Sequence, residues 1–167
     1  MRVLKLTLVI FFSIAIFLSA FSLLFPPHLH IARNVNIDAN ITRVLKVIGD
    51  LHTWSKWNAI VNDTVLTNLK ISKDGKEAES DQLDLQIKPD STQGIFIVWR
   101  KRNGQKFYGG IKLFNAGPDS VSLQWYFDFA FSWWPWEKFS SLVYDRQFQP
   151  IIEQSLNNLK RLIENNP

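Results

Sequence analysis

Residues 120–164 read SVSLQWYFDFAFSWWPWEKFSSLVYDRQFQPIIEQSLNNLKRLIE, and the spacing of their apolar side chains changes once along the way. From Val121 to Phe131 the apolar residues occupy the odd positions. Such alternation is typical of a β-strand with one face on a core and the other mostly in water. After an aromatic turn, the spacing becomes that of an amphipathic helix, which predicts a sheet closing around one long C-terminal helix. The apolar stripe of this helix is Phe148, Ile151, Ile152, Leu156, Leu159, Leu162 and Ile163.

The preceding residues predict the remainder of the sheet. Alternation predicts a first strand at 31–37, and apolar residues at helical spacing predict a short helix at 41–48, capped by Asp38 or Asn40. A Trp-containing segment, 50–58, follows. Further alternating or apolar runs predict strands at 65–71, 83–87, 95–99 and 107–113. Together with the strand of residues 120–131, these form an antiparallel five-strand meander.

Three glycine-containing sites predict the turns and bends of that meander. Gly75 is expected at a positive φ in a hairpin turn, and Asn103-Gly104 suits a type I′ turn. Gly109-Gly110 interrupts a strand pattern, which indicates a bulge or a bend.

Composition restricts the class of protein. Hydrophobic residues make up 46% of the 167 residues, and aromatic residues 14%, enough for a sizeable core. No cysteine is present, so disulfides, thiolate metal sites and thiol catalysis are excluded. Without Arg2 and Lys5, which precede a hydrophobic run, 17 basic residues face 15 acidic ones. This balance is not a nucleic-acid footprint, and no nucleic-acid partner is expected.

Leu6 to Phe25 is an uncharged run of 20 residues, long enough to cross the hydrocarbon core of a bilayer. We therefore expect residues 1–25 to be a membrane anchor, 26–30 a linker begun by Pro26-Pro27, and 31–167 a folded domain. Arg2 and Lys5 favour a cytoplasmic N-terminus, with the C-terminal domain on the extracytoplasmic side. The alternative is a signal peptide that is cleaved after export.

Two groups of residues resemble the START-like (SRPBCC) superfamily, the polyketide cyclase/dehydrase and lipid-transport group, and its bacterial subgroup with an N-terminal membrane segment. The N-terminal group is Arg33, Val35, Ile37, Ala39, Val44, Asp50, Trp54 and Trp57. The C-terminal group is Trp125, Pro135, Trp136, Asp145, Pro150, Leu156, Leu159, Lys160 and Glu164.

The resemblance implies an α+β helix-grip fold, a curved antiparallel sheet wrapped around the C-terminal helix, here preceded by one transmembrane helix. It also implies an apolar ligand cavity between sheet and helix. Ser155 stands where the family usually has Gly, so we expect a smaller or filled cavity. The cavity candidates are Trp57, Trp99, Phe107, Ile111, Trp125, Phe127 and Phe129.

Catalytic and metal-binding patterns were not found. The three histidines lack zinc-type spacing with acidic residues, and no cofactor motif is present. Asp128, Tyr108 and Tyr126 occupy even positions, so alternation turns them away from the cavity. No catalytic residue of the cyclase branch can be carried over to this sequence.

Trp133, Trp134 and Trp136 form an aromatic turn just before the C-terminal helix. One reading is that they seal an end of the core, with Trp136 the best candidate. The other is a lip at the cavity mouth that dips into lipid, since Trp favours the bilayer interface.

Three functions remain open from sequence. The first is a membrane-anchored, non-catalytic domain that binds a small apolar ligand such as a lipid or isoprenoid. The second is a cyclase- or hydrolase-type enzyme using the same cavity, which an inward-facing acid, base or His would favour. The third is an interaction module whose cavity is filled by its own side chains. Any protein partner is unknown.

Overall fold

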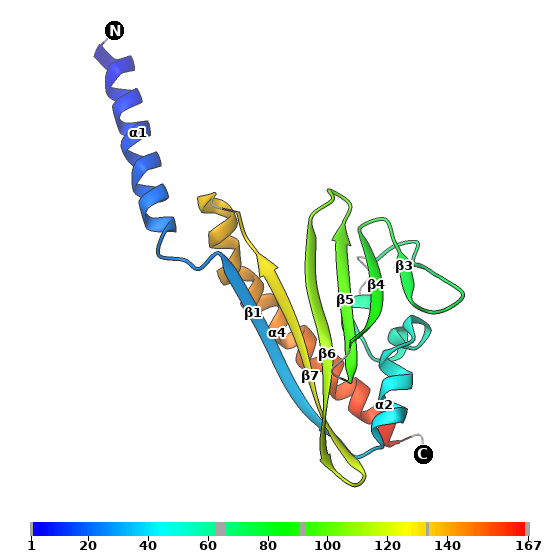
Figure 1. Cartoon of the computed structure of the whole chain (residues 1–167). Helices are drawn as coiled ribbons and strands as arrows, with labels where there is room; N and C mark the ends of the chain where they lie inside the picture. The colour runs from blue at the N-terminus through cyan, green and yellow to red at the C-terminus, as the bar shows by residue number, and fades with distance from the viewer. Residues whose placement is uncertain (1, 63–65, 91–92, 133, 166–167) are drawn as a thin grey trace.

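A computed structural model of the chain describes residues 2–62, 66–90, 93–132 and 134–165. One antiparallel sheet has the strand order β1-β7-β6-β5-β4-β3-β2, and α4 lies along one of its faces (Figure 1). This is the predicted helix-grip arrangement. The elements are α1 (Arg2–Ser22), β1 (His28–Ile37), α2 (Ile41–Ile48), η1 (Leu51–Lys56), α3 (Ala59–Asn62), β2 (Lys70–Ile71), β3 (Glu77–Glu79), β4 (Leu83–Asp90), β5 (Gly94–Lys101), β6 (Lys106–Gly117), β7 (Ser120–Ala130) and α4 (Pro135–Glu164).

The predicted seam between β7 and α4 forms the centre of the core. The odd-numbered residues of β7 from Val121 to Phe129 are buried, as alternation predicts. Four residues of the helix stripe are buried against them: Ile152, Leu156, Leu159 and Ile163. Both faces agree with the sequence because each element has to bury one apolar side.

The edge strand β1 begins earlier than expected. His28 already pairs with Ala130, and the Pro27 carbonyl accepts a hydrogen bond from the Phe131 N–H at 2.8 Å. Residues 28–30, which were assigned to the linker, therefore belong to the sheet. The β7 partner continues that far, so the ladder extends to within a few residues of α1.

Two side-chain caps start the helical segment after β1. Asn40, one of the two predicted caps, accepts the Thr42 N–H at 2.8 Å and begins α2. Asp50 accepts the His52 N–H at 3.0 Å and begins η1. These caps fix the chain so that Trp54 and Trp57 both point into the core.

The meander differs from its prediction in number of strands and in turn geometry. The strand expected at 65–71 is only Lys70–Ile71 (Val65 lies outside the described residues), and β3 was missed because Ala78 is its single buried residue. Gly75 has the expected positive φ of 67°. In the Asn103-Gly104 turn only Gly104 has a positive φ, so the type I′ assignment was wrong.

The predicted irregularity in β6 is also displaced. The ladder with β7 keeps its register through Gly109 and Gly110, and the bulge lies between Asn115 and Gly117. The two glycines instead permit close strand approach, since a Cβ on Gly109 would lie 2.6 Å from the Tyr126 carbonyl oxygen.

The N-terminal helix α1 stands apart from the sheet (Figure 1). Its 21 residues span about 32 Å, with a mean hydropathy of 2.4 over its most apolar window. By length and composition it could be a membrane span or a signal sequence. The helix ends at Ser22, three residues before the end of the predicted run. Phe21 and Phe25 then contact Phe139 of α4, and their ring centroids lie 6.1 and 5.2 Å, respectively, from that of Phe139.

Candidate functional site

An apolar cavity of about 300 Å³ lies between β5, β6 and β7 on one side and α3 and α4 on the other. Aromatic and aliphatic side chains make up most of its wall, and Gln82 and Lys101 are its polar lining residues. Its volume is at the low end of the range for small-molecule sites. The lining residues are Ile60, Leu66, Gln82, Leu83, Trp99, Lys101, Phe107, Phe127 and Phe148.

Four tryptophans, here called the Trp cluster, fill the interior beside this cavity: Trp54, Trp57, Trp99 and Trp125. Each is fully buried. The Trp125 ring lies edge-on to Trp57 and Trp54, with centroids 5.6 and 6.5 Å apart. Trp54 donates its indole N–H to the Ile48 carbonyl at 2.8 Å, whereas those of Trp57, Trp99 and Trp125 have no acceptor among the described residues. The four indole rings therefore fill part of the space between the sheet and α4.

Phenylalanines form the cavity wall on the side of β6, β7 and α4. Phe107 stacks on Trp99 at 5.6 Å, and Phe127 and Phe148 lie 5.6 Å apart across the interface between β7 and α4. Phe129 contacts both Phe107 and Phe148 at 5.1 Å. Aromatic pairs at these distances are favourable contacts, so the wall on this side is apolar and closely packed.

The structure divides the predicted cavity residues into two groups. Trp99, Phe107 and Phe127 line the cavity. Trp57 and Trp125 belong to the Trp cluster, while Ile111 and Phe129 are buried in the core without lining the cavity.

Sequence reasoning missed six lining residues. Phe148 was predicted only as part of the helix stripe, and Lys101 was not assigned to the cavity. Lys101 lies two residues after Trp99, so strand alternation could have placed it on the inner face. Leu83 and Leu66 belong to the strands predicted at 83–87 and 65–71 but were not assigned to the cavity, and no periodic signal marked Ile60 or Gln82.

Ser155, which stands where the family usually has Gly, contacts α3. Its buried hydroxyl donates to the Ile151 carbonyl at 2.7 Å and accepts the Ala59 N–H at 2.9 Å. The hydroxyl thus ties α3, which carries the lining residue Ile60, to the middle of α4.

Lys101 is the cation at the cavity mouth. Its Nζ donates to the Tyr144 hydroxyl at 3.2 Å and lies 5.4 and 6.0 Å from the ring centroids of Tyr144 and Phe107. Tyr144, the hydrogen-bond partner of Lys101, also lines a second hollow, here called the end hollow. The end hollow is lined by Asn103, Gln105, Ala130, Phe131, Ser132, Glu137 and Tyr144.

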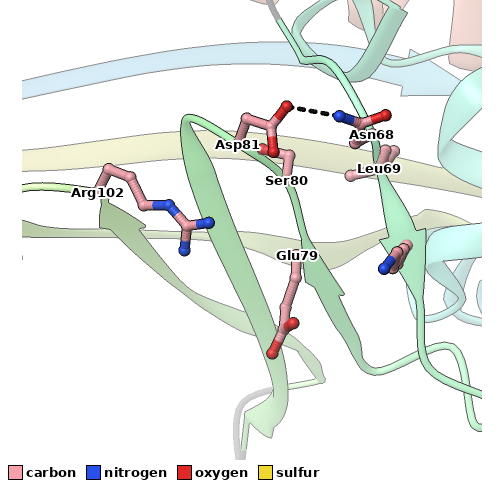
Figure 2. A pocket seen from close by; sticks show the side chains of 7 residues that line it. Asn68, Leu69, Glu79, Ser80, Asp81 and Arg102 are labelled. Atoms are coloured by element: carbon pink, nitrogen blue, oxygen red, sulfur yellow. Dashed lines mark hydrogen bonds between the residues drawn. The ribbon is translucent and has the colours of Figure 1, made fainter.

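A larger hollow of about 460 Å³ lies at the rim of the sheet, where Arg102 faces Glu79 and Asp81 (Figure 2). Asp81 accepts hydrogen bonds from the Thr67 hydroxyl at 2.9 Å and from Asn68 at 2.7 Å, and these hold the pKa of its carboxyl below the usual value. Most of its lining residues are exposed. The smaller, apolar cavity is therefore the stronger candidate for a ligand site.

The outer face of the sheet carries the residues that alternation turned outward. His30 Nδ1 lies 2.5 Å from Asp128 Oδ1, and its ring stacks on Tyr126. Burial, followed by the charges of Asp90 and Asp128, raises the pKa of the Tyr126 hydroxyl. Among the described residues, no three potential ligands group closely enough to hold a metal ion.

The aromatic turn lies at the end of the domain next to α1 (Figure 1). Trp134 and Trp136 stack with centroids 4.7 Å apart and are 41% and 62% exposed. Trp136, the candidate for sealing the core, therefore does not seal it. Trp133 lies outside the described residues.

Comparisons with known proteins agree with this geometry. The family described as "Polyketide cyclase / dehydrase and lipid transport" matches residues 28–164. No curated protein matches the sequence.

Three similar solved structures share the fold at low sequence identity. A START superfamily protein from Mycobacterium smegmatis has 14% identity and a TM-score of 0.59, covering 83% of this chain and 99% of its own. The Zhui aromatase/cyclase from Streptomyces sp. R1128 has 14% identity and a TM-score of 0.55, with coverages of 80% and 94%. Norcoclaurine synthase from Thalictrum flavum, with dopamine and hydroxybenzaldehyde, has 8% identity and a TM-score of 0.58, with coverages of 84% and 88%.

Proposed function

The chain belongs to the polyketide cyclase/dehydrase and lipid-transport family, and on that premise we propose that it is a membrane-anchored protein that binds a small apolar ligand without transforming it. The observation that carries the proposal is the apolar cavity, walled by Trp99, Phe107, Phe127 and Phe148 beside a densely filled core. Transfer of an apolar ligand from water into this cavity is favourable, because its apolar surface leaves water. The mostly apolar wall offers few hydrogen-bond partners, so the ligand needs few polar groups.

Two features support placement at a membrane. Helix α1 is apolar and exposed along its length, and Phe139 of α4 contacts its C-terminal end through Phe21. Arg2 and Lys5 before the apolar run favour a domain outside the cytoplasm. Protease added to intact cells should then digest the domain, whereas protection would place it in the cytoplasm.

The main alternative is a cyclase- or hydrolase-type enzyme in the same cavity. Two of the similar structures are named as an aromatase/cyclase and a synthase, which keeps this reading open. Against it, the described lining residues include no Asp, Glu or His, so a general acid or base would have to come from Lys101 or from outside the lining.

We expect native mass spectrometry of the full-length protein, extracted gently from its membrane, to show a co-purifying apolar molecule. Leu83→Trp places an indole in the cavity, so this variant should lose the molecule because its space is taken. Phe114→Trp is the matched control, since Phe114 is 52% exposed and does not line the cavity, and it should keep the molecule.

The same spectra separate the other readings. A protein mass that corresponds to a chain beginning near Leu23 rather than at Met1 would mean that the N-terminal segment is a cleaved signal peptide and not an anchor. A bound molecule whose mass changes during incubation would favour the enzyme. An empty wild-type protein that also fails to bind added 1-decanol would overturn the binding function and favour a filled interaction module.

We further propose that Trp134 and Trp136 form a lip that rests in the bilayer interface beside α1. The support is their exposure and their position at the α1 end of the domain, together with the amphipathic character of indole.

The lip can be tested by fluorescence quenching in lipid nanodiscs whose acyl chains carry bromine. Bromolipid should quench part of the Trp emission of the full-length protein, and Trp134→Phe/Trp136→Phe should remove most of that quenched part. Trp54→Phe is the control, because Trp54 is fully buried and its loss should leave the quenched part unchanged. Equal quenching of wild type and the double variant would place both rings away from lipid.

A further inference from the structure

Lys101 places a positive charge at the boundary between the apolar cavity and the end hollow. It lines the cavity, and its ammonium lies beside Tyr144 and Gln105, which both line the end hollow. The neighbouring basic residues differ from it: Arg100, Arg102 and Lys106 are exposed, whereas Lys101 is half-buried.

The charge of Lys101 has no acidic partner among the described residues. None of the ion pairs among the described residues includes Lys101. Its ammonium has three donors, of which Tyr144 takes one at 3.2 Å and Gln105 Oε1, at 3.5 Å, at most a second. Partial burial of an unpaired cation is unfavourable, and the two aromatic rings offset only part of the cost.

Strand geometry links this cation to the apolar wall. Trp99 and Lys101 are two residues apart on β5, so their side chains leave the same face about 6.6 Å apart along the strand. A molecule that lies against the Trp99 ring therefore presents its outer end to the Lys101 ammonium.

We infer that the ligand is a single-chain amphiphile whose anionic head group, a carboxylate or a phosphate, accepts hydrogen bonds from Lys101 while its chain fills the apolar cavity. This inference rests on the proposed function and narrows its ligand class. At about 30 Å³ for each non-hydrogen atom, 300 Å³ holds a chain of about ten carbons. A diacyl lipid is too large to enter whole.

The end hollow provides room for the head group. Its polar lining includes Asn103, Gln105 and Ser132, and it also contains the carboxylate of Glu137, which would repel an anion placed beside it. Glu137 already accepts the Ser132 N–H at 2.8 Å, which partly offsets its charge. The head group is therefore expected on the Lys101 side of the hollow.

The test uses the full-length protein in phosphatidylcholine nanodiscs, with binding of carboxyl-labelled [1-¹³C]decanoate, decyl phosphate and [1-¹³C]1-decanol followed by NMR and corrected with empty nanodiscs. We expect Lys101→Met to weaken decanoate and decyl phosphate binding by at least about tenfold, because a charge-assisted hydrogen bond is lost, with little effect on 1-decanol. Lys101→Arg should retain most of the affinity. Lys112→Met is the matched control, since Lys112 makes a similar contact with the Tyr126 ring on the outer face.

The outcomes separate the two proposals. If 1-decanol binds as tightly as the anions and Lys101→Met changes neither, the head-group assignment is wrong and the apolar binding function stands. If none of the three probes binds to wild type, both proposals fail. If only one of the anions depends on Lys101, it identifies the head group as carboxylate or phosphate. Equal losses in Lys101→Met and Lys112→Met would also overturn the assignment, because they would reflect net charge.

Discussion

Replacing Trp125 by Ala should lower the free energy of unfolding by about 3–5 kcal/mol, the range for removing a large buried aromatic side chain. Trp125 is fully buried and touches Trp54, Trp57 and Phe127, with ring centroids between 5.3 and 6.5 Å away. Its loss leaves a void in the middle of the Trp cluster, which rigid neighbouring rings cannot fill by collapsing.

Urea unfolding of the full-length protein, followed by far-ultraviolet circular dichroism, measures this loss. Trp136→Ala is the matched control, since the same side chain is removed from a site that is 62% exposed, and its cost should stay below about 1 kcal/mol. Similar unfolding midpoints for the two variants would mean that the Trp cluster is not the centre of the core.

Leu159→Ala should destabilise the protein by about 2–5 kcal/mol. Leu159 is fully buried on the α4 face that packs against the sheet. Truncation removes apolar contacts and leaves a cavity. Helix α4 can move only slightly to close it, because it packs against β1, α3 and η1.

Asn157→Ala tests the opposite face of the same helix. Asn157 is exposed, so its replacement should change stability by no more than about 0.5 kcal/mol. Both variants place Ala in α4, where its helix propensity is favourable, so the difference between them reports packing. Comparable costs would mean that the assigned helix face is wrong.

The sequence predicted the elements whose burial has a regular period. In β7 and α4 long runs of one period identified both the element and its buried face. Short elements were predicted poorly. Strand β3 buries only Ala78, which is too little for a pattern. The turn type at Asn103-Gly104 was predicted wrongly because Asn-Gly also occurs in turns where only the glycine has a positive φ.

The cavity was harder to predict than the fold. Alternation identified Trp99, Phe107 and Phe127 as inward-facing, but inward residues either fill space or line it, and the sequence does not separate the two. Trp125 and Phe127 face the same way on β7, yet only Phe127 reaches the cavity, because the indoles of Trp54 and Trp57 occupy the space beside Trp125. Lys101 was missed because charged side chains are usually exposed to solvent.

The pairing of β1 with β7 has a consequence for biosynthesis. The ten residues of β1 leave the ribosome soon after α1, but their partners lie roughly 80–100 residues later in the chain. At roughly 5–20 residues per second, translation delivers β7 about 4–20 s after β1. During that interval Ile31, Val35 and Ile37 have no sheet to join, so the nascent chain holds an unpaired, partly apolar strand next to α1 until β7 has been made.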